Sequence, residues 1–215
     1  MNRTRRLLQF SALTVAFAGL LGCGDRASAP DVAPVPLLTE AEANARTVVP
    51  LTRTVSLAKR GVVADFEFDL PPPDPSAVPD LTIGFRLEAK DAKALRDQSG
   101  LILREGIPVA IRLTRLDITP KARVPLSRDS SDRSTQLALT DDGRVPGVTA
   151  TSVDNSMLRG AGLFAAGKRY QILMLAHAED VAPGRYHVSV ELLENQPSMR
   201  LIDAQLIIAY SYRAK

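Results

Sequence analysis

The segment Val62-Val63-Ala64-Asp65-Phe66-Glu67-Phe68-Asp69-Leu70 alternates apolar and acidic side chains along most of its length. Successive side chains of an extended strand point to opposite faces. This period of two therefore puts Val62, Ala64, Phe66, Phe68 and Leu70 on one face and the carboxylates on the other. A strand with one apolar face needs a second layer of structure to cover that face. The segment therefore predicts a β-sheet protein with a buried interior.

The same alternation recurs further along the chain, and turn-forming residues separate the alternating runs. These runs are residues 81–88, 109–113, 186–192 and 202–212. One helix is expected in residues 89–98, which are rich in Ala, Lys, Asp and Leu and are followed by Gly100. Many short strands with a single helical interruption are typical of a sandwich.

Residues 47–215 are therefore predicted to form one mostly β domain. Its expected fold is an antiparallel β-sandwich, immunoglobulin-like or jelly-roll-like, with one short helix. The chain has no Trp and few other aromatic residues, so the core should be largely aliphatic. The predicted core is centred on Phe66, Phe68, Phe85, Ile111, Leu173, Val188 and Ile208.

The N-terminus has the pattern of an export signal. Arg3, Arg5 and Arg6 stand without an acidic neighbour and precede a mainly apolar run, residues 7–21. A permanent membrane span needs roughly 20 apolar residues, so this run is short for that role. Residues 1–22 are predicted to be a signal peptide.

The run ends in Leu20-Leu21-Gly22-Cys23, which resembles the bacterial lipobox. The resemblance implies cleavage between Gly22 and Cys23, a diacylglycerol on the Cys23 thiol and acylation of the new amino terminus. An ordinary secretory signal and a plain membrane anchor are the alternatives. Lipidation is favoured because Cys23 is the only cysteine and stands where such signals end.

Residues 23–46 are predicted to be a lipidated start followed by a flexible tether. They are rich in Ala, Pro, Asp and Glu and hold almost no bulky apolar residue before Leu37. Such a composition does not bury enough surface to offset the entropy of ordering. A tether of this kind would let the β domain stand clear of the lipid headgroups.

The charge balance argues against nucleic acid as a partner. Without the three arginines of the leader, 24 basic side chains face 24 acidic ones. Nucleic-acid binding requires an excess of basic charge on some face. Membrane attachment is therefore expected through the acyl chains on Cys23 rather than through a basic surface.

No catalytic residue, cofactor or metal is predicted. The only histidines are His177 and His187, and no Gly-x-Ser-x-Gly elbow accompanies them, so a hydrolase is the third and weakest hypothesis. The segment Gly162-Leu163-Phe164-Ala165-Ala166-Gly167-Lys168 matches a phosphate loop up to its lysine, but Arg169 follows where Ser or Thr is required. It is interpreted as a loop that enters a strand near Tyr170.

Two polar loops are candidate partner-facing surfaces, because binding residues on a rigid β scaffold tend to lie in its loops. Their residues are Arg128, Asp129, Asp132 and Arg133 in the first loop, and Asp141, Asp142 and Arg144 in the second. These carboxylates are of the kind that bind calcium, but the ligand spacing of an EF-hand is absent. Turn chemistry explains Asp141-Asp142-Gly143.

Several segments in their order resemble a family of proteobacterial lipoproteins known only as a domain of unknown function. The resemblance rests on the segments 66–68, 81–87, 106–113 and 183–190, and on the helix between the second and third of them. It implies a β-sandwich lipoprotein. Genes of this family often lie beside genes for type VI secretion effectors, which implies an immunity protein. The prolines of residues 71–75 and the polar loop after Pro125 depart from the family pattern.

The sequence thus favours a non-enzymatic binding protein that faces the periplasm and neutralises a toxin. The alternative is an envelope lipoprotein that binds glycan or has a structural role. Gly24 rather than Asp follows Cys23, which resembles lipoproteins sorted to the outer membrane, although Asp25 comes one place later. The outer membrane is therefore expected in preference to the inner one.

Overall fold

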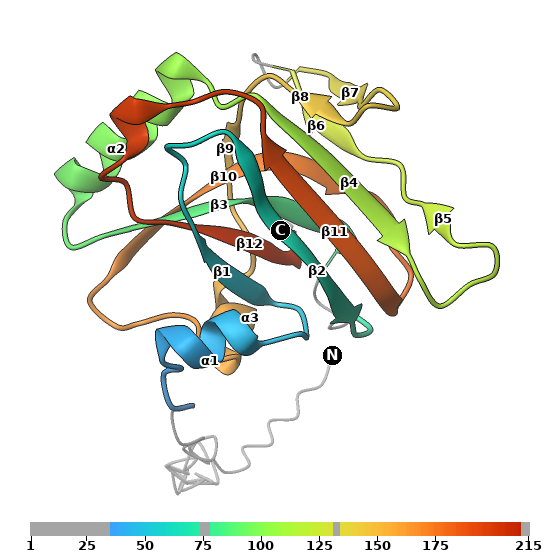
Figure 1. The fold of residues 1–215 in the computed structure, drawn as a ribbon. Coiled ribbons are helices and arrows are strands. Elements are labelled where there is room, and N and C mark those ends of the chain that lie inside the picture. The colour runs from blue at the N-terminus through green and yellow to red at the C-terminus, as the bar shows by residue number, and fades with distance from the viewer. Residues whose placement is uncertain (1–34, 74–77, 131–133, 212–215) are drawn as a thin grey trace, which may run out of the picture. The chain divides into compact units, whose positions relative to one another are not determined.

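The computed structural model describes residues 35–73, 78–130 and 134–211. In this part of the chain two antiparallel β-sheets pack face to face (Figure 1). The predicted class, a mostly β sandwich, is confirmed. The predicted signal peptide and the predicted cleavage site at Gly22 and Cys23 lie outside the described residues.

The larger sheet has seven strands. Its order is β1 (Leu51–Val55), β12 (Ala204–Tyr210), β3 (Leu81–Ala89), β10 (Arg169–Ala178), β6 (Ser127–Asp129) and β7 (Gln136–Ala138), and β9 (Thr149–Thr151) also pairs with β10. The centre of this sheet is the long pairing of β3 with β10, in which Phe85 lies opposite Leu173.

The smaller sheet has five strands. Its order is β2 (Gly61–Leu70), β11 (Gly184–Leu192), β4 (Val109–Arg115) and β5 (Ala122–Arg123), and β8 (Arg144–Val145) also pairs with β4. In β11 every second residue is buried, from Tyr186 to Leu192. This alternation arises because one face of the smaller sheet packs on the core and the other faces solvent.

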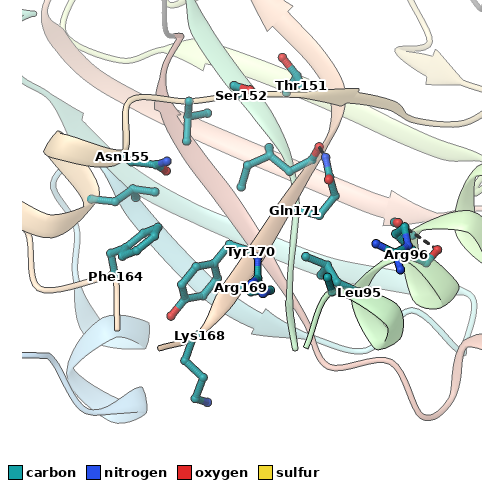
Figure 2. Close-up of a pocket in the computed structure, with 15 residues that line it drawn as sticks. Leu95, Arg96, Thr151, Ser152, Asn155, Phe164, Lys168, Arg169, Tyr170 and Gln171 are labelled. Atoms are coloured by element: carbon teal, nitrogen blue, oxygen red, sulfur yellow. Dashed lines mark hydrogen bonds between the residues drawn. The ribbon is translucent and has the colours of Figure 1, made fainter. Parts of the chain in front are cut away.

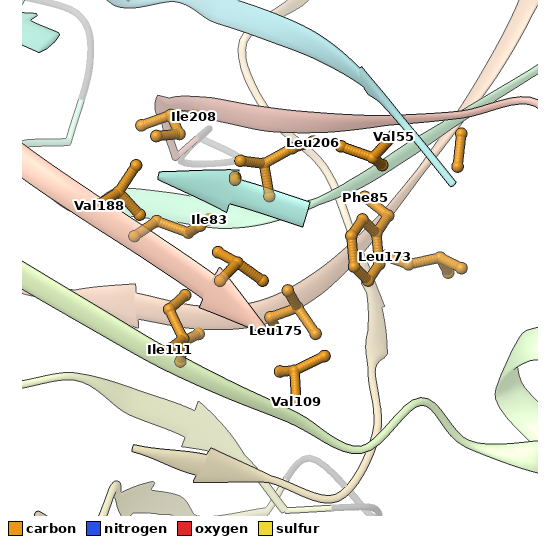
Figure 3. Close-up of a cluster of buried hydrophobic side chains, with 14 of the residues drawn as sticks. Val55, Ile83, Phe85, Val109, Ile111, Leu173, Leu175, Val188, Leu206 and Ile208 are labelled. Atoms are coloured by element: carbon orange, nitrogen blue, oxygen red, sulfur yellow. The ribbon is translucent and has the colours of Figure 1, made fainter. Parts of the chain in front are cut away.

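The core lies between the sheets and is largely aliphatic (Figure 3). Of the seven predicted core residues, six are exposed by 1% or less, and the seventh, Phe66, is partly buried against the cluster. Full burial of such a side chain contributes about 1.5–3 kcal/mol. The core prediction is confirmed except for the full burial of Phe66, which lies on an edge strand.

The larger sheet is also covered on its outer face. A second apolar cluster there includes Leu158, Leu163, Ile172 and Ile207, and Ala43 packs against it. The chain segments that form this cover include α1 (Glu40–Ala45) and α3 (Asn155–Gly160). Burial on both faces explains why residues 172–178 of β10 are all buried, without alternation.

The main helix, α2 (Ala92–Glu105), lies where a helix was expected but is longer than predicted. Gly100 lies inside it and does not end it. The helix ends at Gly106, whose φ of 74° favours glycine and whose N–H donates to Ile102 O. Because Ile102 is buried, the apolar face continues past Gly100 and holds the helix together there.

Residues 35–46, part of the segment expected to be a tether, belong to the same compact unit as the β-sheets. Helix α1 starts with a capping box in which the Thr39 hydroxyl accepts from Glu42 N. Arg53 of β1 donates to Ala43 O at 2.9 Å and to Arg46 O at 2.5 Å, which ties the helix to the sheet. No helix among the described residues is long and apolar enough to cross a bilayer.

A β-bulge in β2 turns Val62 away from the core, so its predicted place on the apolar face is wrong. The register between β2 and β11 shifts so that Ala64 lies opposite Val190 and Val62 lies opposite Glu191, which leaves Val63 as the extra residue. Val63 packs against the core, whereas Val62 is 62% exposed.

Gly84 is expected to be essential for the central pairing of β3 and β10. A Cβ atom at this position would lie 2.4 Å from Leu173 O and 2.9 Å from Met174 Cα, both backbone atoms. Gly84→Ala should lower the free energy of unfolding by about 1–3 kcal/mol, measured by urea denaturation. Gly160→Ala, where a Cβ meets no atom within 4 Å, is the control and should change it by less than about 0.5 kcal/mol. Equal effects of the two substitutions would contradict this account.

Candidate functional site

A cavity of about 420 Å³ opens on the outer face of the larger sheet (Figure 2). Its walls come from the first half of α2, from residues 151–153, from Asn155 and Leu158 of α3, and from the first residues of β10. We call it the basic hollow, defined by Arg96, Lys168 and Arg169 together with Phe164 and Tyr170. It is the candidate functional site.

Local capping and pairing position these walls. The Asp91 carboxylate accepts from Ala94 N at 2.8 Å and starts α2, and the Asp154 carboxylate accepts from Ser156 N at 2.7 Å and starts α3. Thr151 of β9 lies opposite Ile172 of β10, which brings the segment before α3 beside the strand.

The lining of the basic hollow carries three cations and no carboxylate. Arg96 and Arg169 are exposed. Lys168 pairs with Glu88 of β3, and this hydrogen bond raises the pKa of the lysine above its usual value. Cations that face a hollow without carboxylates produce a local positive potential in a chain whose total charge is close to balanced.

Two aromatic rings form part of the wall. Phe164 and Tyr170 lie with their centroids 4.8 Å apart at an interplanar angle of 49°. The guanidinium of Arg86 lies 4.7 Å from the Tyr170 centroid, and that of Arg159 lies 4.8 Å from the Phe164 centroid. Each ring therefore has a guanidinium over it, and the two rings also contact each other.

Arg86 is a buried cation behind this wall, only 4% exposed. Its Nε donates to Gln205 Oε1 at 2.8 Å and its Nη1 donates to Leu163 O at 2.6 Å. No carboxylate of the described residues pairs with it within 4.0 Å. Burial lowers the pKa of the guanidinium, and the neighbouring Glu88 charge opposes that shift.

Arg86 also lines a second cavity, of about 640 Å³, which we call the second hollow. Lys168 and Tyr170 line both hollows, so these two residues form their common wall. The second hollow includes Glu40, Glu88 and Asp203 beside its basic residues. Its charges are mixed, in contrast to those of the basic hollow.

The residues predicted from the sequence to face a partner lie elsewhere. Arg128 and Asp129 belong to β6 and line a third, smaller cavity beside the end of α2, and Asp132 and Arg133 lie outside the described residues. Asp141 and Asp142 lie in an exposed turn, and Arg144 begins β8.

The second of these loops is held by its own contacts. Arg144 pairs with Asp142 at 3.0 Å, and the Thr140 hydroxyl, donating at 2.6 Å, lowers the pKa of the Asp142 carboxyl. The structure does not bring either loop to the basic hollow. Their role in partner binding stays a prediction.

The two histidines lie in different sheets and do not act on a common point. His177 of β10 is 6% exposed, and neither ring nitrogen has a hydrogen-bond partner among the described residues. His187 of β11 lies with Nε2 2.5 Å from Asp65 Oδ1 on the exposed face of the smaller sheet. Neither histidine lines the basic hollow or the second hollow. In the described ranges no group of three or more His, Cys, Asp or Glu residues could hold a metal ion.

Comparison with known proteins adds little to this picture. No protein-family model matches the chain. No curated protein matches it. A crystal structure of a protein from Sulfurospirillum deleyianum is similar over 76% of this chain and 98% of that protein, with 12% identical residues and a TM-score of 0.39.

Sequence reasoning missed the basic hollow, although one signal for it is visible in the chain. Residues 155–178 contain Arg159, Lys168 and Arg169 but no Asp or Glu. The segment resembling a phosphate loop lies inside this range and, as expected, is a loop that leads into β10. Arg96 belongs to a distant helix, so its place in the same hollow was not visible from spacing.

Gln205 is expected to stabilise the fold by accepting from buried Arg86. Gln205→Leu should lower the free energy of unfolding by about 1–3 kcal/mol because it leaves guanidinium donors without an acceptor. The double variant Arg86→Met/Gln205→Leu should lose less than Gln205→Leu alone, since it removes the buried charge as well. Urea denaturation of the single and double variants measures the coupling.

The control for this cycle is Gln136→Leu, at an exposed position of β7, which should change the free energy of unfolding by less than about 0.5 kcal/mol. Simple additivity of the Arg86 and Gln205 substitutions would show that the two residues do not depend on each other.

Proposed function

We propose that this protein is a lipid-anchored binding protein of the cell envelope, without catalytic activity, that faces the periplasm. Its anchor would be the lipid on Cys23, in a segment that resembles a lipobox. Its partner would be a protein, and the function that fits best is that of an immunity protein which neutralises a secreted effector. Such a protein acts by occupying the active cleft of the effector or the surface with which the effector docks on a membrane.

The observation that carries the proposal is the basic hollow. It combines a defined cavity, three cations and no lining carboxylate on the outer face of a sheet that is covered on both sides. Charged groups arranged in this way select a partner of opposite charge and accelerate the encounter with it. The side chains that line it are suited to binding, since none of them is a His, Cys, Asp or Glu that could serve as base or thiol nucleophile.

The anchor is tested by Cys23→Ala. We expect this variant to leave the membrane fraction, because the acyl chains are the proposed attachment, and to keep the melting temperature of the β domain. Ser28→Ala, a similar change in the same segment that retains the cysteine, is the control and should stay with the membrane. Membrane fractionation of Cys23→Ala like that of the control would contradict the proposed anchor.

The immunity role is tested by deletion of the gene in cells that meet each effector encoded beside it. We expect at least one effector to kill the deletion strain, and we expect a plasmid copy of the wild-type gene to restore survival. Unchanged survival with every neighbouring effector would overturn the role. In that case copurification of the protein with cell-wall material would point to the alternative, an envelope lipoprotein that binds glycan or has a structural role.

A further inference from the structure

We propose that the basic hollow binds an acidic peptide segment of the partner, whose carboxylates lie against Arg96, Lys168 and Arg169. This inference rests on the proposed function, a protein that binds another protein, and specifies the chemistry of the contact. Arg96 comes from α2, Lys168 from the end of the loop before β10 and Arg169 from the first position of β10, so the fold rather than one local run of sequence assembles the three cations.

The charges of Arg96 and Arg169 are available to a ligand. Both side chains are exposed, and neither has an ion-pair partner within 4.0 Å in the part of the chain that the structure describes. Asp97, the acidic neighbour of Arg96 on α2, pairs instead with Lys93 at 2.7 Å. Arg96 acts on Asp97 only through its electric field, so Arg96 and Arg169 both present a positive charge that no direct ion pair in the described chain neutralises.

Lys168 has an internal competitor for the same ligand. Glu88 pairs with it from the neighbouring strand β3 and lines the second hollow, not the basic hollow. An arriving carboxylate would replace Glu88 or share the lysine with it. Removal of the Glu88 charge should therefore tighten binding, a result that a cluster of purely structural charges would not give.

The walls favour a peptide over a saccharide or a lipid. A sugar that stacks on an aromatic ring needs a free ring face, but a guanidinium lies over Tyr170 and another over Phe164, and the tilted contact between the two rings reduces the free surface further. Insertion into a membrane needs exposed apolar side chains, and none of the large exposed apolar residues of the described chain lines the hollow. Buried Leu95 and Leu158 instead give the cavity apolar walls of the kind that accept side chains.

The test uses the mature lipidated protein in non-ionic detergent and fluorescence polarisation of labelled probes. Hexaglutamate is the acidic peptide, hexaglutamine is its uncharged counterpart, hexagalacturonate carries the same number of carboxylates on a saccharide, and dihexanoyl phosphatidylglycerol is a soluble anionic lipid. We expect hexaglutamate to bind most tightly, and we expect its affinity to fall as salt is added.

Charge-reversal variants test whether hexaglutamate binds at the basic hollow. Arg96→Glu/Arg169→Glu should weaken hexaglutamate binding by at least about tenfold, whereas Glu88→Gln should tighten it by about threefold. The matched control is Arg112→Glu/Lys121→Glu, which reverses two exposed cations at β4 and just before β5. It should change the affinity by less than about twofold, because charges far from the site are screened.

The proposal is overturned by equal losses in the two double variants, by tighter binding of the saccharide or the lipid than of hexaglutamate, or by no binding of hexaglutamate. Its failure is distinguishable from failure of the proposed function. If deletion of the gene sensitises cells to an effector and the Arg96→Glu/Arg169→Glu protein still restores full survival, the immunity role stands and the hollow is not its contact surface.

Discussion

The buried guanidinium of Arg86 is the interaction on which the candidate site depends. A charge removed from water is costly unless polar partners surround it, and here Gln205, the carbonyl of Leu163 and the ring of Tyr170 supply them. Leu163 belongs to the loop after α3, whereas Arg86, Tyr170 and Gln205 belong to three adjacent strands of the larger sheet. Arg86 thus fastens the loop to the sheet. Phe164 and Lys168, which that loop carries, are thereby held at the basic hollow.

The two sheets divide the roles of the molecule. The smaller sheet buries one face, and its other face carries solvated pairs such as Arg185 with Glu67 at 2.8 Å, whose contribution to stability is small. The larger sheet buries both faces, so its outer side has the packed walls that a cavity needs. This difference explains why the cavity with concentrated charge lies on the larger sheet. The exposed face of the smaller sheet resembles an ordinary wetted surface.

The segment that follows the proposed tether takes part in the same outer layer. Leu38 and Ala43 pack against the outer cluster, and Leu37 and Glu40 line the second hollow. The composition predicted a flexible segment up to residue 46. Helix α1 has only six residues and none of its side chains is fully buried, so its sequence lacks the apolar pattern that would have predicted a helix. The contacts of Arg53 with the carbonyls of Ala43 and Arg46 supply the order that the local sequence lacks.

The sequence by itself determined the β-sandwich class and nearly all of the predicted core, because alternation records directly which side of a strand is buried. It also placed the main helix, but not its end at Gly106, since the burial of Ile102 beyond Gly100 depends on packing against the sheets. Only the tertiary structure brought Arg96 together with Lys168 and Arg169. The physical reason is that periodicity is a local property, whereas a site built from a helix and a distant strand depends on the long-range pairing of β3, β9 and β10. The charge of the polar loops around Asp129 and Asp142 is local and therefore visible in the sequence, whereas the charge of the basic hollow is assembled by the fold.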